Sequence, residues 1–154
     1  MQQSQHVLKW KRFKSEKKQM QQKLIIDTDP GIDDAMAIHY AFAHPGLDVL
    51  GLTTIFGNVF VSQATRNALL LSEQAHYSVN VAEGAAKPLV QSLNPPSHHV
   101  HGAEGFGDVP VKQPYGMQVE ISAADYIVKK CRQHSGEVIL CPVGPLTNIA
   151  AALK

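Results

Sequence analysis

The sequence predicts an α/β domain built on an open, mostly parallel sheet with helices on both faces. Along residues 24–154, short apolar runs of strand length alternate with longer segments of helical periodicity, and this alternation is typical of parallel sheets. Three of the expected strands also end in loops that carry acids, asparagine or glycine. In open parallel sheets, ligands bind at the carboxyl ends of the strands, so we expect these loops to meet at one site.

The first 23 residues differ in composition from the rest of the chain. They carry seven basic residues and one acid, whereas residues 24–154 carry seven basic residues and twelve acids. A basic, Gln-rich segment with few apolar residues cannot bury enough surface to order itself. An arm that binds nucleic acid is one interpretation. We adopt the other, a disordered tail outside the domain, and expect no nucleic acid as a partner.

The first predicted elements are a strand, a helix and a second strand. Residues 23–28 (KLIIDT) form an apolar run that stops at a polar loop, as a buried strand does. After the Pro30-Gly31 turn, AMAIHYAFAH has apolar residues on most sides, which predicts a largely buried helix to about His44. Residues 47–55 (LDVLGLTTI) are rich in branched side chains and predict the second strand.

A second helix, a short strand and a long loop follow. Residues 62–76 have an apolar stripe and a polar face, which predicts an amphipathic helix. Residues 79–82 predict a third, short strand. Residues 83–116 are rich in glycine and proline and contain a histidine cluster. A loop of this length within a compact domain is usually functional or disordered.

Regular structure is expected again near the end of the sequence. Ser122 is placed to cap a helix that runs to about His134, residues 137–143 (EVILCPV) predict a strand, and Thr147 is placed to cap a last helix. Cys131 and Cys141 are the only cysteines, and we expect both to be buried free thiols. Free thiols favour a reducing compartment, so we expect a cytoplasmic protein. No run of about eighteen apolar residues occurs, so we expect no contact with a membrane.

The loop after the first strand holds four carboxylates within eight residues: Asp27, Asp29, Asp33 and Asp34. Four acids on one turn repel each other unless something positive neutralises them. The start of a helix favours anions by only about 1 kcal/mol per group, which is too little for four. A hard divalent cation with oxygen ligands is the natural partner, and Ca²⁺ accepts several carboxylates together with carbonyl and hydroxyl oxygens. The loop therefore predicts a calcium site.

Three other interpretations explain this loop less well. A single acid at a helix start is usually a cap, which would explain Asp33 or Asp34 alone. The spacing does not match the calcium loop of helix-loop-helix proteins, which needs ligands at alternate positions. A phosphatase of the haloacid dehalogenase type also has Asp-x-Asp after its first strand, but Pro30-Gly31-Ile32 replaces the expected Gly-Thr pair.

Segments in five regions of the chain resemble the nucleoside hydrolase family, the inosine–uridine preferring type. DTDPGIDDAMAI at 27–38 looks like the family's N-terminal signature. The further segments are LTTIFGN at 52–58, TRNA at 65–68, KPL at 87–89 with HGAEGFGD at 101–108, and GPLTNIA at 144–150. The resemblance covers residues 24–154 and implies a Rossmann-like nucleoside hydrolase fold. It also implies calcium-dependent hydrolysis of the N-glycosidic bond of ribonucleosides, giving ribose and free base.

The family's roles carry over to residues of this chain as expectations. Asp29 would bind calcium and act as the general base, and Asp34 and the backbone carbonyl of Val143 would be further calcium ligands. Asp33 and Asn58 would bind the ribose, and His101 would lie near the nucleobase. Asp27 would brace the other acids. The neighbouring His98 and His99 are better explained as solvated loop residues.

Members of this family are longer than this sequence, and their C-terminal half supplies further calcium, ribose and leaving-group residues. We therefore expect this chain to correspond to an N-terminal half, with an unpaired sheet edge. Two functions follow from that expectation. One is a ribonucleoside hydrolase, a homodimer or homotetramer if the full domain forms. The other is an inactive remnant or binding module that keeps the cation and ribose loop.

Overall fold

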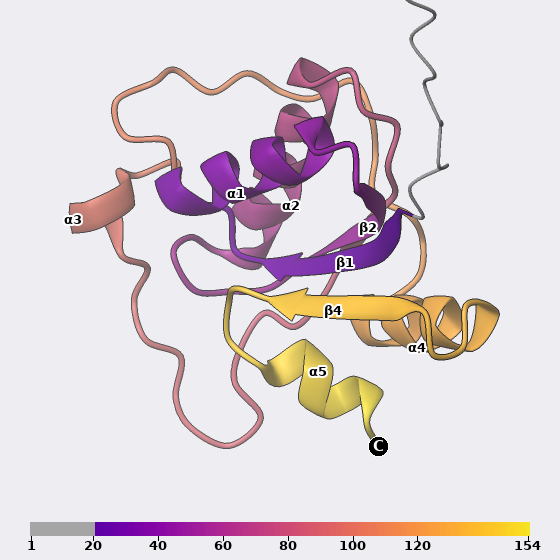
Figure 1. Cartoon of the computed structure of the whole chain (residues 1–154). Helices are drawn as coiled ribbons and strands as arrows, with labels where there is room; N and C mark the ends of the chain where they lie inside the picture. The colour runs from indigo at the N-terminus through magenta and orange to yellow at the C-terminus, as the bar shows by residue number, and fades with distance from the viewer. Residues whose placement is uncertain (1–20) are drawn as a thin grey trace, which may run out of the picture.

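The computed structural model describes residues 21–154, and these form a four-stranded sheet with helices on both faces (Figure 1). The strand order is β3-β2-β1-β4, and every pair of neighbours is parallel. The predicted fold class is therefore confirmed. The strands are β1 (Gln22–Thr28), β2 (Leu47–Thr54), β3 (Val81–Glu83) and β4 (Val138–Pro142).

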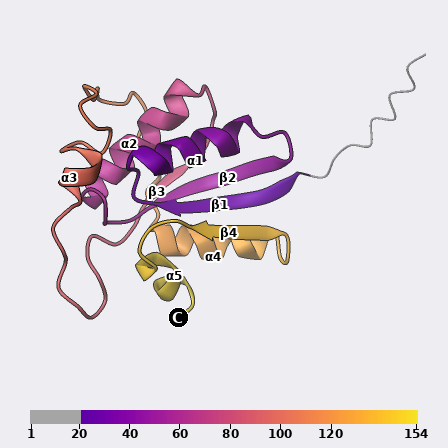
Figure 2. The ribbon, with the colours of Figure 1, turned by 60° about the vertical axis from the view of Figure 1, so that its left-hand side comes forward.

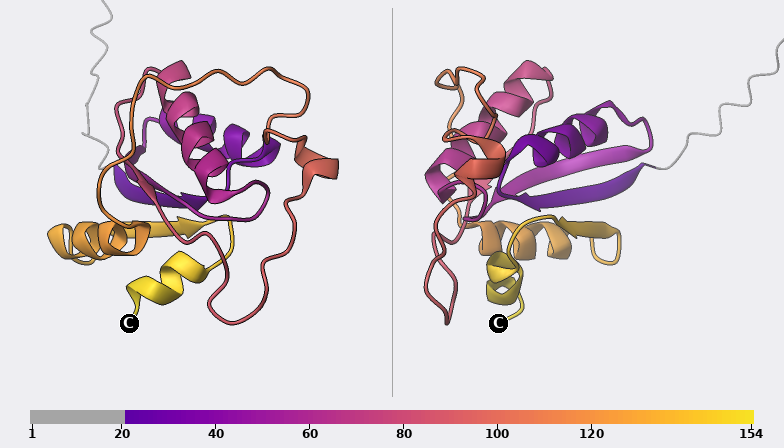
Figure 3. Two further views of the ribbon diagram at one scale, coloured as in Figure 1. Left: turned by 180° about the vertical axis from the view of Figure 1, so that it is seen from behind. Right: turned by 90° about the vertical axis from the view of Figure 1, so that its left-hand side faces the viewer.

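The helices lie in two layers (Figure 2). One face of the sheet is covered by α1 (Ile32–Ala43) and α2 (Val61–Gln74), and the other by α4 (Ala123–Gln133) and α5 (Thr147–Ala152). A short helix, α3 (His98–His101), interrupts the long loop and was not expected from the sequence. Figure 3 shows this loop leaving the sheet, reaching α3 beside the start of α1 and returning past α2.

The chain path creates a switch point beside β1. From β1 the chain steps outward through α1 to β2 and through α2 to β3, and then it crosses back through α4 to β4 on the other side of β1. The loops after β1 and β4 therefore diverge to opposite faces at the same edge. In doubly wound sheets, the crevice at such a point is where ligands bind.

The main apolar core lies between the sheet and the first two helices. Strand β1 has buried residues on both of its faces. Ile25 and Leu52 are fully buried in neighbouring strands, and Ile38 of α1 is also fully buried. Buried parallel strands read as continuous apolar runs, and LII in β1 is one. At its end this run meets buried polar groups, because Asp27 and Thr53 lie opposite each other in the β1–β2 ladder.

Helix α1 is less buried than its sequence suggests, so the prediction of a largely buried helix is wrong. Ile32, Met36 and Tyr40 are exposed, and among its apolar residues only Ile38 and Ala41 are fully buried. The reason is that α1 packs on the sheet and α2 with one face only. Its outer apolar stripe borders an open groove with Phe106 and Val109.

Four smaller expectations have mixed outcomes. Ser122 caps α4 as predicted, because its hydroxyl accepts the amide of Asp125 at 3.1 Å. Thr147 is the first residue of α5 rather than its cap, which is Leu146. Cys131 and Cys141 are free but half-buried, so the prediction that both are buried is wrong; Cys141 lies on β4, an edge strand among residues 21–154. Of the predicted N-terminal tail, Gln22 and Lys23 already belong to β1, and residues 1–20 lie outside the described residues.

None of the helices in residues 21–154 combines the length and apolar character needed to cross a membrane.

Candidate active site

Three loops meet at the carboxyl edge of the sheet, as the sequence predicted. The acidic loop follows β1, residues 56–58 follow β2, and residues 143–146 follow β4. The loops are linked by backbone hydrogen bonds, because Ile55 donates to the Thr28 carbonyl and Val143 donates to the Asp27 carbonyl. Strand pairing therefore holds the predicted site residues together.

Asp29 is the most electrostatically perturbed group at this edge. It is buried, and its Oδ2 accepts the backbone N–H of Asn58 at 2.6 Å. Burial raises its pKa to about 7, and the nearby charge of Asp34 and then that of Asp33 add to the rise, while the Asn58 amide opposes it. A carboxyl with this pKa can take up or release a proton near neutral pH.

Two glycines make room for the Asp29 carboxylate. A Cβ at Gly57 would strike Oδ2 of Asp29, and a Cβ at Gly144 would lie 2.6 Å from its Oδ1. The loops after β2 and β4 can therefore close on this carboxylate only because neither carries a side chain at these positions.

Asp34 is buried, and like Asp29 it accepts a hydrogen bond from Asn58. Its Oδ1 accepts the Thr28 hydroxyl at 2.7 Å, and its Oδ2 accepts the Gly31 amide at 3.3 Å. The Asn58 side chain donates Nδ2 to the same Oδ2 at 3.0 Å. Asn58 thus connects both carboxylates, through its backbone to Asp29 and through its side chain to Asp34.

Asp27 lies behind the other acids and is fully buried. Its Oδ1 accepts the Thr53 hydroxyl at 2.5 Å and the Asn148 amide at 2.8 Å. Its Oδ2 has no hydrogen-bond partner among the described residues. Burial raises the pKa of Asp27, although both hydrogen bonds lower it. These contacts are with Thr53 and Asn148 and not with the other acids, so the bracing role implied for Asp27 stays a prediction.

Asp33 and His101 lie together at the start of α1. The Asp33 side chain is 81% exposed, and its Oδ1 lies 3.8 Å from Nδ1 of His101. That nitrogen accepts the Ile32 amide at 3.2 Å, so it carries no proton to donate to Asp33, and the two groups form no hydrogen bond. His101 is buried against the acidic loop, whereas His98 and His99 are exposed on α3.

The donor set at this edge fits a hard cation. Asp29 and Asp34 offer carboxylate oxygens, and Val143, on the neighbouring loop, offers a carbonyl. Within residues 21–154, no group of three or more His, Cys, Asp or Glu side chains is arranged to hold a metal ion alone. A cation here would therefore need backbone, substrate or water oxygens besides the two carboxylates, which calcium accepts readily.

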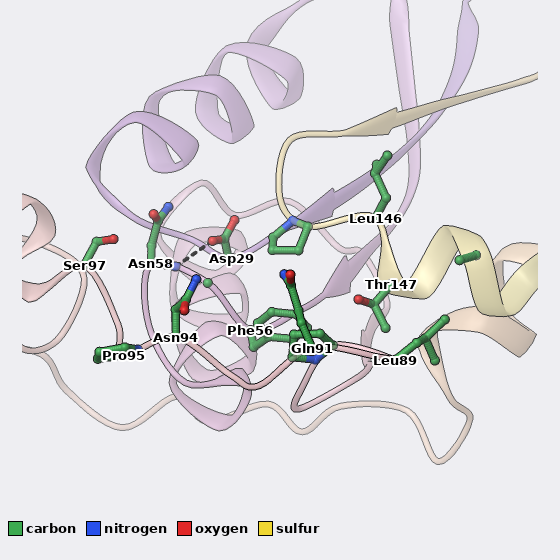
Figure 4. A pocket seen from close by; sticks show the side chains of 14 residues that line it. Asp29, Phe56, Asn58, Leu89, Gln91, Asn94, Pro95, Ser97, Leu146 and Thr147 are labelled. Carbon is green, nitrogen blue, oxygen red and sulfur yellow. Dashed lines mark hydrogen bonds between the residues drawn. The ribbon is translucent and has the colours of Figure 1, made fainter.

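A cavity of about 590 Å³ opens in front of Asp29 (Figure 4). Phe56 and Asn58 line it from the loop after β2, and Leu146 and Thr147 line it from the start of α5. The long loop closes it with amide, hydroxyl and apolar side chains: Leu89, Gln91, Asn94, Pro95 and Ser97. Its volume suits a small polar ligand.

Some residues of the site were missed from the sequence. Asn148 is fully buried against Asp27, although it lies in a helix of otherwise small or apolar residues. Asn67 is also buried and donates to the carbonyls of Pro30 and Glu104, which ties the acidic loop to the loop of His101. Asn67 gave no signal because it is one of several polar residues in an amphipathic helix, and Asn148 gave none because it lies far along the sequence from Asp27. The cavity-lining residues of the long loop gave no signal either.

Comparison with known proteins agrees with this geometry. Residues 24–154 match the family model described as "Inosine-uridine preferring nucleoside hydrolase". Uridine nucleosidase 1 of Arabidopsis thaliana is 52% identical over 134 residues, which cover 86% of this chain and 40% of that protein. A solved plant nucleoside hydrolase, PpNRh1, superposes with a TM-score of 0.82 at 45% identity, covering 86% of this chain and 42% of its own. A purine-preferring ribonucleoside hydrolase from Gardnerella vaginalis gives a TM-score of 0.82 at 35% identity, covering 85% of this chain and 43% of its own.

The chain thus spans about two fifths of the length of the relatives that it matches. The matched region contains the acidic loop, the loop after β2 and the turn after β4, so it includes every residue of the site described above. The family match and the convergence of these loops lead to the same conclusion: this chain belongs to the inosine-uridine preferring nucleoside hydrolase family.

Proposed function

We propose that this chain carries the cation- and ribose-binding half of a calcium-dependent ribonucleoside hydrolase. The observation that carries the proposal is Asp29, a buried carboxyl with a pKa of about 7 that faces a cavity at the switch point of the sheet. Perturbed carboxyls in such clefts are typical of catalytic sites. The chain's relatives are named as enzymes that act on nucleosides.

In the proposed reaction, a water oxygen attacks C1′ of the ribose while the bond from C1′ to the base nitrogen breaks. The bonding electron pair leaves with the base, which takes up a proton. Asp29 accepts the proton that the attacking water loses. Burial raises the pKa of Asp29 in the chain without metal. A calcium ion bound to the same carboxylate would favour its charged form, so Asp29 would be ionised and able to accept a proton at neutral pH.

Asp29, Asp34 and the carbonyl of Val143 would hold the calcium ion. When bound, it would fix the ribose hydroxyls and make a bound water more acidic. Asp33 is exposed at the start of α1, where its carboxylate is free to accept a ribose hydroxyl. Asn58 donates to both Asp29 and Asp34, and its side-chain oxygen would bind the sugar. His101 supports the acidic loop beside the position proposed for the base.

Uridine is the first substrate to test, because a relative named as a uridine nucleosidase is 52% identical to this chain. A role in nucleoside catabolism and salvage follows from that reaction. We also propose a cytoplasmic location, because both cysteines are free thiols. A homodimer or homotetramer is proposed for the protein when the full domain is assembled.

The test is an assay of uracil release from uridine by the purified chain with calcium, with Asp29→Asn as the matched variant. The proposal predicts release that depends on calcium and falls by at least about a hundredfold in the variant, as expected for the loss of a general base. Release that is equal in both proteins would contradict the role of Asp29.

The alternative is a module that binds calcium and ribose without hydrolysis. The observation that favours this alternative is that the chain spans only about two fifths of the length of its relatives. It predicts that uridine binds in the presence of calcium while no uracil forms. Calorimetry with uridine, performed beside the assay, separates the two functions.

A further inference from the structure

Asn148 is the buried polar group that joins α5 to the sheet. It is 2% exposed and lies at the second residue of the helix. Its Nδ2 donates to Oδ1 of Asp27 at 2.8 Å and to the Thr54 carbonyl at 2.9 Å, and its Oδ1 accepts the Ala85 amide at 2.9 Å. One side chain therefore connects the ends of β1 and β2 with the segment after β3.

The partners and the space allow one orientation of this amide. A flipped amide would place Oδ1 against the Thr54 carbonyl and Nδ2 against the Ala85 N–H, so both contacts would become repulsive. A Cβ at Gly84 would strike both polar atoms of the Asn148 side chain. The side chain is thus held in one position, and this fixes the place of the residues that precede it in the chain.

Those residues form the turn 143–147, which carries one side of the site. At the start of the turn, the Val143 amide donates to the Asp27 carbonyl at 2.8 Å. At the other end, Asn148 binds the Asp27 side chain. The turn is therefore attached to the same residue at both ends, and Pro145, Leu146 and Thr147 line the cavity between these two anchors.

Helix α5 packs against α4, but few of its side chains are buried. Helix α5 has six residues, Leu146 and Leu153 at its two ends are exposed, and Asn148 is its one buried residue. A helix this short is marginal without tertiary contacts. Its contact with α4 does not reach the strand ends, and the side-chain hydrogen bonds from the start of α5 to those ends come from Asn148.

We propose that Asn148 is a positioning residue of the nucleoside hydrolase site. It fixes the turn 143–147, and with it the Val143 carbonyl and one cavity wall, relative to Asp27 and Asp29. The inference rests on the proposed function, because it is the cation site that gives the position of this carbonyl its importance. Groups that orient metal ligands in this way typically change metal affinity by ten- to a hundredfold when they are removed.

The test compares three variants of the full chain. Asn148→Leu keeps the shape of the side chain without its polar groups, and Asn148→Ala leaves space for water if the leucine variant does not fold. Tyr126→Phe is the matched control, because it removes a hydrogen bond from α4 to the Leu50 carbonyl, away from the site. Backbone amide exchange is measured first, without metal.

In an Asn148 variant, we expect faster exchange at Val143, Gly144 and Ala85, while the β1–β2 ladder keeps the wild-type rates. Calcium affinity, measured by calorimetry, should fall by roughly tenfold or more. The luminescence lifetime of bound Tb³⁺ should shorten, because water replaces a displaced protein oxygen. Tyr126→Phe should change neither the metal affinity nor the lifetime.

Unchanged exchange at Val143, Gly144 and Ala85 in a folded Asn148 variant would overturn the proposal, whatever the metal does. An increase spread evenly over the sheet would overturn it as well, since that is the result of a general loss of stability. Failure of the wild-type chain to bind calcium or Tb³⁺ would instead contradict the proposed cation site, and the exchange data would still decide the role of Asn148.

Discussion

Asp29 combines burial with close acidic neighbours, and this combination has consequences that can be measured on the isolated chain. Its ordinary pKa is 3.8, and in the folded protein it is about 7. Between these two pH values the folded state binds about one more proton than the unfolded state does. Stability therefore decreases as pH rises through this range, because the slope follows the difference in bound protons.

The first prediction concerns this pH dependence. In the presence of a chelator, the free energy of unfolding of the wild type, relative to that of Asp29→Asn, should fall as pH rises from about 4 to about 7. The total change should be on the order of 4 kcal/mol, since each unit of pKa corresponds to about 1.4 kcal/mol. Urea denaturation at several pH values measures it, and a difference that is constant with pH would contradict the buried, proton-binding Asp29.

The second prediction concerns the space around Asp29. Gly57→Ala should displace its carboxylate, because the added Cβ would strike Oδ2, and calcium affinity should fall by roughly tenfold or more. Gly136→Ala is the control. At φ +76° the control should lose about 1 kcal/mol of stability, but nothing lies within 4 Å of its Cβ. Equal calcium affinities of the two variants would contradict the close fit at Gly57.

The residues that the sequence identified are those whose chemistry is unusual for their position. Four acids on one turn demand a partner of opposite charge, and the structure gathers Asp27, Asp29 and Asp34 at one edge. Hydrogen-bond partners such as Thr53 and Asn148 could not be foreseen, because their sequence distance from Asp27 gives no sign of the contact. Only the paired strands and α5 bring them together.

Among the secondary structure elements, α2 connects two of the loops that carry the predicted site residues. Asn67, fully buried in this helix, donates to the carbonyls of Pro30 and Glu104. Arg66 supports the same connection through an ion pair with Glu104 at 2.6 Å. The acidic loop and the loop of His101 are therefore both attached to one helix, which should make them move together.

The third prediction tests this coupling. Asn67→Leu keeps the side-chain volume but leaves the Pro30 carbonyl without its donor, while the Glu104 carbonyl keeps only Arg66. This should cost about 1–3 kcal/mol. Amide exchange should become faster at Ile32 and Gly107, whose N–H groups bond to His101. In the control Ser72→Ala, a hydrogen bond within α2 is lost, and those two amides should keep their rates. Unchanged exchange in Asn67→Leu would contradict the coupling.

The type and order of the main strands and helices were predictable because hydrophobic periodicity sets them. The exposure of α1 was not predictable, because an apolar helix has the same sequence pattern whether its outer face is covered or exposed. The short helix α3 was also missed, because four residues, three of them histidines, show no periodicity. The chemistry of a segment was thus easier to predict than its burial.

At the scale of the whole molecule, the notable feature is the open edge at β4. In residues 21–154 this strand pairs only with β1, and the exposed apolar residues Ile139, Val143 and Leu146 lie on or next to it. An unpaired strand with apolar neighbours is a template for association with another chain. The protein should therefore associate through this edge when it is concentrated.

The fourth prediction is that Ile139→Lys weakens this association. Sedimentation at increasing concentration should show association of the wild-type chain, reduced in the variant because a charge on an edge strand opposes pairing. Val90→Lys is the control, since Val90 is 98% exposed in the long loop, away from β4. Equal association of all three proteins would place the contact elsewhere.

We propose that the acidic loop at the switch point binds a divalent cation through Asp29. The most direct measurement is calorimetric titration of calcium into the 154-residue chain at neutral pH, with Asp29→Asn as the matched variant. We expect saturable binding by the wild type that is lost in the variant. Absence of binding by the wild type, or equal binding by both proteins, would contradict it.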